Sequence, residues 1–238
     1  GMSGSATVTI NPLPPTFTVS GGGGYCSGGS GLHILLSGST PFGVSYQLYN
    51  TGSPTGSPLP GTGTALDFGL QTAAGTYTVK AVNAATGCSS VMNGSAVINI
   101  NSVPAAYAVT GGGSFCAGGA GVQIGLSSSD AGVNYQLYVG TSPVGSVMAG
   151  TGGTLNFGYQ IIGGIYTVKA TNALTGCVNT MTGTAIVVVN PLPVVQILTG
   201  GRDYCIGGLG VHIGLSSSQA GVSYQLSNGL VLAGIPVP

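Results

Sequence analysis

Apolar and polar residues alternate along many short stretches of this chain. In LHILLS the side chains of Leu32, Ile34 and Leu36 fall on one face, and in TYTVKAV those of Tyr77 and Val79 do the same. A period of two residues is typical of a β-strand with one buried face. Turns rich in glycine and proline separate these stretches every 8–15 residues, and no stretch keeps a helical period. Many short strands with this spacing predict a β-sandwich.

The chain repeats itself with a period of about 89 residues. The stretch SYQLYN returns as NYQLYV and SYQLSN, and GTYTVKAVNAATGC at Gly75 returns as GIYTVKATNALTGC at Gly164. The opening GMSGSATVTINPLP matches VMNGSAVININSVP from Val91, so Met2, Met92 and Met181 share one position of the pattern. We therefore expect a part of a longer tandem array. The predicted segments are the last strand of a preceding repeat at 1–11, complete repeats at 12–101 and 102–190, and a partial repeat at 191–238.

Two positions of the repeat carry tyrosine. Tyr46 and Tyr135 lie where immunoglobulin domains have their buried core tryptophan, and Tyr224 has the same position in the last copy. Tyr77 and Tyr166 lie at the entry to the penultimate strand, where a tyrosine corner would fall. We expect all five to be structural. The predicted fold is all-β, with immunoglobulin-like or fibronectin III-like sandwiches joined by short proline-containing linkers (NPLP, NSVP) into an extended array.

The chain is almost uncharged, which excludes several kinds of partner. It has 3 Lys+Arg and 3 Asp+Glu, a charged fraction of 3% against about 25% in ordinary soluble domains. Three scattered cations cannot neutralise the phosphates of a nucleic acid or of an anionic lipid surface. The acids Asp67, Asp130 and Asp203 lie in different segments, so we expect no metal and no cofactor. No apolar run approaches the ~18 residues of a membrane-spanning helix, so membrane insertion is not expected.

Five cysteines occupy two positions of the repeat: Cys26, Cys116 and Cys205 precede one strand, and Cys88 and Cys177 follow another. No CxxC occurs, so the pattern indicates disulfides in an oxidising compartment rather than zinc. We favour bonds within each repeat, Cys26–Cys88 and Cys116–Cys177. Such bonds require one link that does not reverse the chain direction, and GSPLPGTGTALDFG could supply it by crossing between sheets at Gly-Thr-Gly. The alternative is a staple from Cys26 to Cys177 across the repeat boundary. Either pairing closes a loop of ~60 residues or more, worth about 4 kcal/mol in the chain-entropy model.

No polar group is repeated in a way that predicts catalysis. His33 and His212 fall on the outward face of one strand and Gln123 replaces them in the middle copy, so we interpret them as surface residues. Lys80 and Lys169 are also expected at the surface, with at most a weak ion pair to Asp67. Further motifs have structural interpretations. The GGGG at Gly21 and GGG at Gly111 are read as flexible loops, LSSSD at Leu126 lacks a partner histidine, Arg202-Asp203 is a loop variation, and NGS at Asn93 is a hairpin turn.

The repeated motifs together resemble a known family. YCSGGSG before a strand, YQLYN, GTYTVKAVNAATGC, and GSAVINI leading to a proline linker are similar to the immunoglobulin-like repeats of very large surface proteins of Bacteroidota. Proteins of that kind are exported by the type IX secretion system and include the giant adhesins of gliding motility. The resemblance covers essentially the whole chain and implies a cell-surface, extracellular location and a role in adhesion or surface structure. It implies no catalytic residues.

From these observations we expect a non-enzymatic stalk or spacer whose partners are neighbouring repeats of the same chain. An alternative is a structural subunit that assembles with like chains into a fibre or sheath, by surface packing or strand donation. Outward faces of Ser, Thr, Asn, Gln and Gly repel one another weakly, which suits lateral association and contact with surface glycans or abiotic, mineral surfaces. A carbohydrate-binding accessory module is the weakest hypothesis, because tryptophan, the usual sugar platform, is absent.

Overall fold

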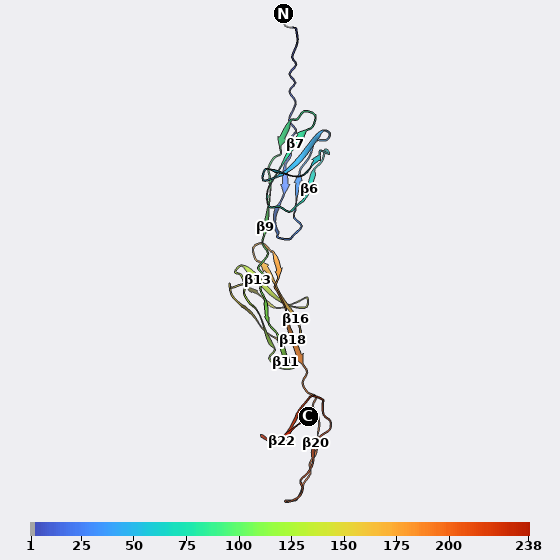
Figure 1. Ribbon diagram of the computed structural model, residues 1–238, viewed down its shortest axis with the longest axis vertical. Coiled ribbons are helices and arrows are strands. Elements are labelled where there is room, and N and C mark those ends of the chain that lie inside the picture. The colour runs from blue at the N-terminus through green and yellow to red at the C-terminus, as the bar shows by residue number, and fades with distance from the viewer. Residues whose placement is uncertain (1–2) are drawn as a thin grey trace.

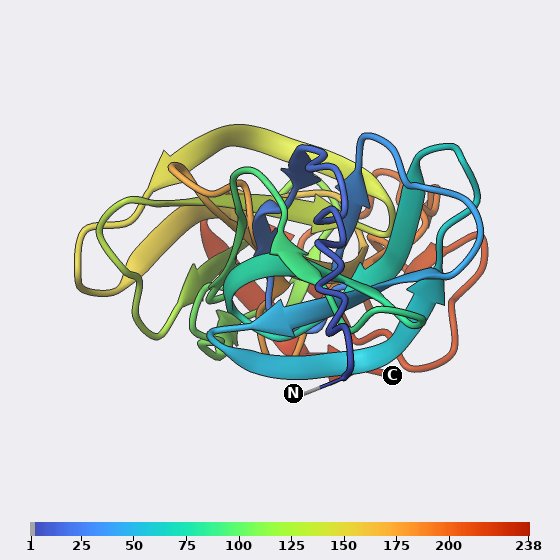
Figure 2. The same cartoon turned by 90° about the horizontal axis from the view of Figure 1, so that it is seen from above.

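The computed structural model describes residues 3–238, and these residues form β-strands, turns and loops. Three units follow one another along a single axis, as Figure 1 shows from the first unit, coloured blue to green, to the red last one. In Figure 2, seen along that axis, the units lie behind one another. Nowhere in residues 3–238 is there a helix with the length and apolarity needed to cross a bilayer. The prediction of an all-β fold is confirmed.

The first unit is a sandwich of two sheets. The smaller sheet has the order β1–β3–β6, and the larger has the order β2–β9–β7–β4–β5 with β8 paired to β7. All neighbours are antiparallel except β2, which runs parallel to β9. The strands are β1 Val19–Gly21, β2 Gly23–Cys26, β3 Leu32–Leu36, β4 Val44–Asn50, β5 Ser53–Pro60, β6 Leu66–Gln71, β7 Gly75–Asn83, β8 Ser89–Val91 and β9 Ala96–Asn101.

The second unit repeats the first strand for strand. Its sheets have the orders β10–β12–β15 and β11–β18–β16–β13–β14, with β17 paired to β16 and with β11 parallel to β18. The strands are β10 Val109–Gly111, β11 Gly113–Cys116, β12 Val122–Leu126, β13 Val133–Val139, β14 Ser142–Ala149, β15 Leu155–Gln160, β16 Gly164–Asn172, β17 Val178–Thr180 and β18 Ala185–Asn190. The same sequence pattern therefore gives the same sandwich twice.

The third unit holds the early strands of the pattern. These are β19 Leu198–Gly200, β20 Ile213–Leu215, β21 Tyr224–Asn228 and β22 Val231–Val237, in two separate pairs. Its apolar side chains line an open hollow between the pairs. In the complete units the later strands of the repeat cover the corresponding side chains.

The glycine runs are the places where the chain changes sheets. After β1 the backbone passes from the smaller to the larger sheet at Gly21 and Gly22, both at positive φ, and β2 starts one residue later. A Cβ at Gly21 would collide with the carbonyl oxygen of His33, and one at Gly22 with that of Val97. Our interpretation of GGGG as a flexible loop is therefore wrong. The run packs backbone against backbone between two strands, which only glycine permits.

Each complete sandwich has its own core, formed by the alternation seen in the sequence. Ile34 and Leu36 of β3 lie with Tyr77 and Val79 of β7 in the first core, and all four are buried. Met92 and Met181 are buried at matching positions of the two cores. The Met92 sulfur accepts a hydrogen bond from the Phe17 N–H, and the Met181 sulfur accepts one from the Tyr107 N–H. Met2, at the same position of the pattern, lies outside the described residues.

Candidate functional site

The strongest candidate for a functional feature is the junction between the first two sandwiches. A disulfide joins Cys26 of the first sandwich to Cys177 of the second, with a Cα–Cα distance of 5.5 Å and a sequence separation of 151. Cys177 is fully buried there. The bond therefore fastens two consecutive units to each other, alongside the short peptide linker that begins at Asn101.

The strand directions place Cys26 at this junction. Because β2 runs parallel to β9, both strands end together, and Cys26 pairs in register with Asn101, the last residue of β9. The next amide, Ser27 N–H, donates to the Asn101 carbonyl at 2.8 Å. Cys26 is therefore held at the end of the sandwich from which the chain leaves, facing whatever unit follows.

The loop after β16 places Cys177 at the end of the second sandwich where the chain enters, which is the end that faces the first sandwich. Strand β16 is antiparallel to β18, so it finishes at the end where the chain enters the unit. The turn that follows is closed by Asn172, whose side chain accepts from the amides of Leu174 and Thr175, both at 3.0 Å. The Cys177 sulfur then lies 4.0 Å from the Asn101 carbonyl oxygen, in the linker. The loop thus brings its cysteine to the linker and to Cys26.

These directions overturn the pairing we favoured within each repeat. The GSPLPGTGTALDFG stretch does change sheets, with β5 in the larger and β6 in the smaller sheet. The change does not bring Cys26 and Cys88 together, since β7, which leads to Cys88, runs opposite to β9. Cys88 lies beside the entering chain, with its sulfur 3.9 Å from the carbonyl oxygen of Asn11. The prediction of Cys26–Cys88 and Cys116–Cys177 is wrong, and the alternative staple across the boundary is the bond in the structure.

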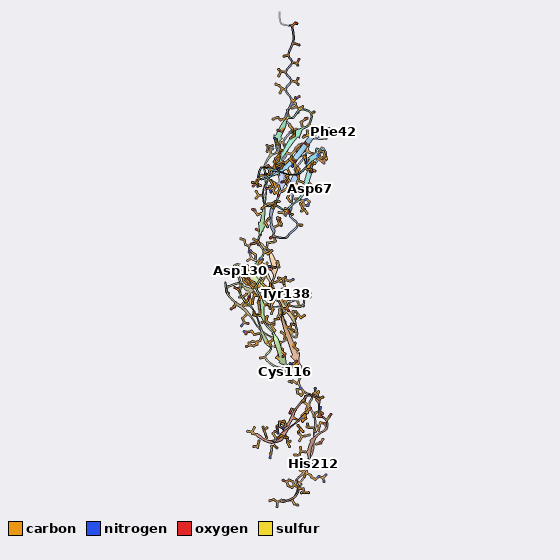
Figure 3. The ribbon with its side chains drawn as sticks, in the orientation of Figure 1. Phe42, Asp67, Cys116, Asp130, Tyr138 and His212 are labelled. Carbon is orange, nitrogen blue, oxygen red and sulfur yellow. A yellow bond between two sulfur atoms is a disulfide. The ribbon has the colours of Figure 1, made fainter. Side chains whose placement is uncertain are left out.

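Three cysteines carry free thiols in the described chain. Cys88 is half-buried at the entry end of the first sandwich, while Cys116 and Cys205 are exposed. Figure 3 places Cys116 at the end of the second sandwich that faces the third unit. Among residues 3–238, no three His, Cys, Asp or Glu side chains gather where they could hold a metal ion.

The repeated tyrosines are tied to the backbone inside the sandwiches. Tyr77 and Tyr166 are fully buried, and their hydroxyls donate to the carbonyls four residues upstream, at Ala73 and Ile162, both at 2.8 Å. Burial raises the pKa of both phenols above the ordinary tyrosine value. The hydroxyls of the other three accept from backbone amides of the loop before their strand: Tyr46 from Thr40 at 2.8 Å, Tyr135 from Asp130 at 2.9 Å, and Tyr224 from Gln219 at 3.0 Å.

The few charged side chains form isolated surface contacts. His33 and Asp67 make an exposed pair at 2.8 Å, so Asp67 is partnered by His33 rather than by the Lys80 we considered. The hydrogen bond from His33, followed by that from the Gly69 amide, lowers the pKa of Asp67. Lys169 lies 5.0 Å from the ring centre of Tyr138, and His212 is exposed.

Sequence reasoning also missed the Tyr107–Asp130 contact and one structural serine. Tyr107 donates its hydroxyl to Asp130 at 2.6 Å in the second sandwich, and this bond raises the pKa of Tyr107. Phe17 takes the same position in the first sandwich and packs edge-on against Tyr46. Ser129, within LSSSD, is buried and donates to the Gly153 carbonyl at 2.6 Å. Its hydroxyl anchors a loop.

Comparisons with known proteins give similarity in structure alone. No family model matches the chain, and no curated protein sequence does. The three-immunoglobulin segment I67–I69 of titin aligns with a TM-score of 0.43 and 13% identity, over 92% of this chain and 86% of that one. Fibronectin(III)-like modules of Clostridium thermocellum CbhA give 0.38 and 14%, over 73% and 95%. Murine CEACAM1b gives 0.37 and 11%, over 73% and 100%. The sandwich assignment rests on the strand order and register of this chain itself.

Proposed function

We propose that this chain is a non-catalytic, extracellular repeat region that works as a disulfide-stapled stalk. The observation that carries the proposal is the Cys26–Cys177 bond, because it joins two units instead of stabilising one. A bond at this place restricts bending and separation of neighbouring sandwiches, which a spacer needs and an isolated binding domain does not. Disulfides persist in oxidising, extracellular surroundings.

The sequence resemblance supplies the finer part of the proposal. The cysteine, tyrosine and linker motifs of these repeats resemble those of giant surface adhesins of Bacteroidota that are exported by the type IX system. In this proposal the chain holds adhesive regions away from the cell surface, in attachment or gliding. Its near absence of charge, 3% of residues, supports a spacer that salt affects little.

Electron microscopy of the intact protein, sheared from cells without reductant, tests this function. A stalk gives a thin beaded thread that is one sandwich wide. A thicker filament of constant width with helical symmetry would overturn the stalk, because the repeats themselves would then be the assembly interface. Adding a reductant to the same sample should make the thread more flexible while leaving its beads.

The multi-chain filament is the second candidate, and one surface patch favours it. In the second sandwich Ile165 of β16 and Ile186 of β18 form an outward-facing cross-strand pair, with Val188 exposed on the same face. The matching residues of the first sandwich are Thr76, Val97 and Asn99, two of them polar. An apolar patch present in only one of two copies is not required by the fold, and apolar patches are typical of contact surfaces.

Grafting the first sandwich's residues tests the patch. The double variant Ile165→Thr and Val188→Asn keeps residue types that this fold already accepts at these positions. If the chains associate through the patch, analytical ultracentrifugation of the unchanged protein shows concentration-dependent oligomers that the variant lacks. Monomers at all concentrations for both proteins would rule the patch out as an assembly interface.

A further inference from the structure

Each end of the disulfide-linked pair of sandwiches carries a free cysteine at a repeat position that is bonded in the junction. At the leaving end of the second sandwich, Cys116 pairs in register with Asn190 at the end of β18, as Cys26 pairs with Asn101. The Ala117 amide donates to the Asn190 carbonyl at 2.8 Å, as Ser27 does to Asn101. Cys116 is therefore held in the setting that Cys26 occupies in the bonded junction, and it is exposed.

At the entering end of the first sandwich, Cys88 reproduces the setting of Cys177. Its carbonyl accepts from Asn83 N–H at 2.9 Å, as that of Cys177 accepts from Asn172 at 2.8 Å. Its sulfur is 3.9 Å from the carbonyl oxygen of Asn11, against 4.0 Å between the Cys177 sulfur and Asn101. Asn11 has the place in the preceding linker that Asn101 has in the next one.

We propose that Cys116 and Cys88 are cross-linking sites for the repeats that adjoin this pair in the same chain. Cys116 bonds the cysteine at the Cys177 position of the following repeat, and Cys88 bonds the cysteine at the Cys26 position of the preceding one. The second, independent observation is the Cys26–Cys177 bond itself, in which the same two positions are joined. No bond forms within a repeat, and every junction has one.

Each bond forms by an ordinary thiol–disulfide exchange. Two thiols lose two protons and two electrons, and a small-molecule or protein disulfide accepts them and becomes two thiols. The mixed disulfide forms first on the exposed thiol of Cys116, and the incoming cysteine then displaces the oxidant's sulfur. The docking of the next sandwich brings the second thiol beside the linker carbonyl.

The order of the cysteines along the chain makes this connection continuous. Cys116 lies between Cys26 and Cys177, so the loop closed by one staple overlaps the loop closed by the next. Every junction is then crossed by two covalent connections, the peptide linker and a disulfide. A single cut in any linker leaves the array in one piece until it is reduced. This property does not depend on whether the array serves as a stalk or as a filament.

A lengthened chain tests the proposal: residues 1–190 followed by a second copy of residues 102–190, so that the native NSVP linker joins the third sandwich. After oxidation with oxidised glutathione, free thiols are blocked and the unreduced protein is digested with trypsin. We expect the peptide of residues 81–169, which holds Cys88 and Cys116, to be linked to the final peptide, which holds the appended copy of Cys177. The unlengthened protein, treated alike, should give this peptide unlinked.

Two variants test which of the two free cysteines, Cys116 or Cys88, forms the new bond. Cys116→Ser should abolish the new link and leave Cys26–Cys177 intact, which also reports that the sandwiches fold. Cys88→Ser should leave both links in place. The proposal is overturned if Cys116 stays fully alkylated while Cys26–Cys177 forms, or if it bonds Cys177 of its own repeat. It is also overturned if Cys116 links separate chains, seen as unreduced dimers on a gel, since the partner would then be a second copy.

Discussion

Cys26 and Cys177 are bonded to each other although fourteen strands, β3 to β16, lie between them in the chain. Tension applied to the two ends of the pair passes from β2 through the sulfur–sulfur bond directly to Cys177. Residues 27–176 lie in the closed loop, so they are outside the covalent path that joins the two ends while the bond is intact. Mechanical resistance of the pair is therefore set by the bond and its few flanking strands rather than by the two sandwich cores.

Force spectroscopy between the chain ends should show this protection. Without reductant, we expect no unfolding event that releases the looped residues. With reductant, the chain between Cys26 and Cys177, a sequence separation of 151, is freed, and the extended contour grows by roughly 500 Å at about 3.3–3.6 Å per residue. The variant Cys26→Ser should behave without reductant as the unchanged protein does with it. Equal extension of the unchanged protein in both conditions would mean that the load does not pass through the bond.

A tryptic map should distinguish the staple from bonds within each repeat. Trypsin cleaves after the basic residues Lys80, Lys169 and Arg202. The staple links the peptides 1–80 and 170–202 and leaves peptide 81–169 free with two blocked thiols. Bonds within each repeat would instead join all three peptides into one species. Mass spectrometry of the unreduced, thiol-blocked digest reads the difference directly, and the same digest after reduction is the control.

The sequence predicted the strands, their buried faces and the period. Alternation is visible within a single strand, and the repeat is visible when the sequence is aligned with itself. Ile34 and Leu36 are buried as the pattern required. The disulfide pairing was mispredicted, since it depends on which strands run parallel. The parallel pairing of β2 with β9 follows from the change of sheets at Gly21 and Gly22, which the sequence shows only as a glycine run.

Other contacts had no signal in a single sequence. The second sandwich has Tyr107 and Asp130 where the first has Phe17 and Thr40. These two differences are related, because Tyr107 and Asp130 are hydrogen-bonded in the folded chain, but their separation in the sequence hides the relation. The His33–Asp67 pair joins residues of β3 and β6, neighbours only once the smaller sheet forms. Its absence from the second copy, which has Gln123 and Asn156, indicates that the fold does not need it.

Stability should be nearly constant across neutral pH and fall at alkaline pH. Burial raises the pKa of Tyr77, Tyr135 and Tyr166, whereas unfolded phenols titrate near about 10. Above that pH the unfolded chain loses protons that the folded chain keeps, so the free energy of unfolding decreases as pH rises. We expect the urea midpoint to be flat between roughly pH 5 and 9 and to drop beyond about 10. A midpoint unchanged up to pH 11 would contradict the burial of these hydroxyls.

The acid side offers a matched control. The lowered pKa of Asp67 contributes stability that is present above the ordinary aspartate value and is lost as pH falls through the folded value. Because the pair with His33 is exposed, this contribution is small. Asp67→Asn introduces the residue of the second copy, where the Asn156 side chain still accepts from the Gly158 amide at 2.8 Å. The variant should remove the acid dependence while leaving the alkaline fall unchanged.

Alanine at the change of sheets should destabilise the second sandwich far more than alanine at an uncrowded glycine of the same unit. At Gly111 a Cβ would strike the carbonyl oxygen of Gln123, and φ is +88°. Strain of this kind costs about 1–3 kcal/mol before the clash is added, so we expect Gly111→Ala to lower the free energy of unfolding by at least about 2 kcal/mol. Gly153→Ala is the control, because its Cβ meets nothing closer than 3.9 Å and its φ is outside the left-handed region. Urea denaturation of both variants under reducing conditions, with the staple open, measures the difference. A shift at Gly111 no larger than that at Gly153 would mean that the run is a mobile loop and that β10 and β11 are not fixed in separate sheets.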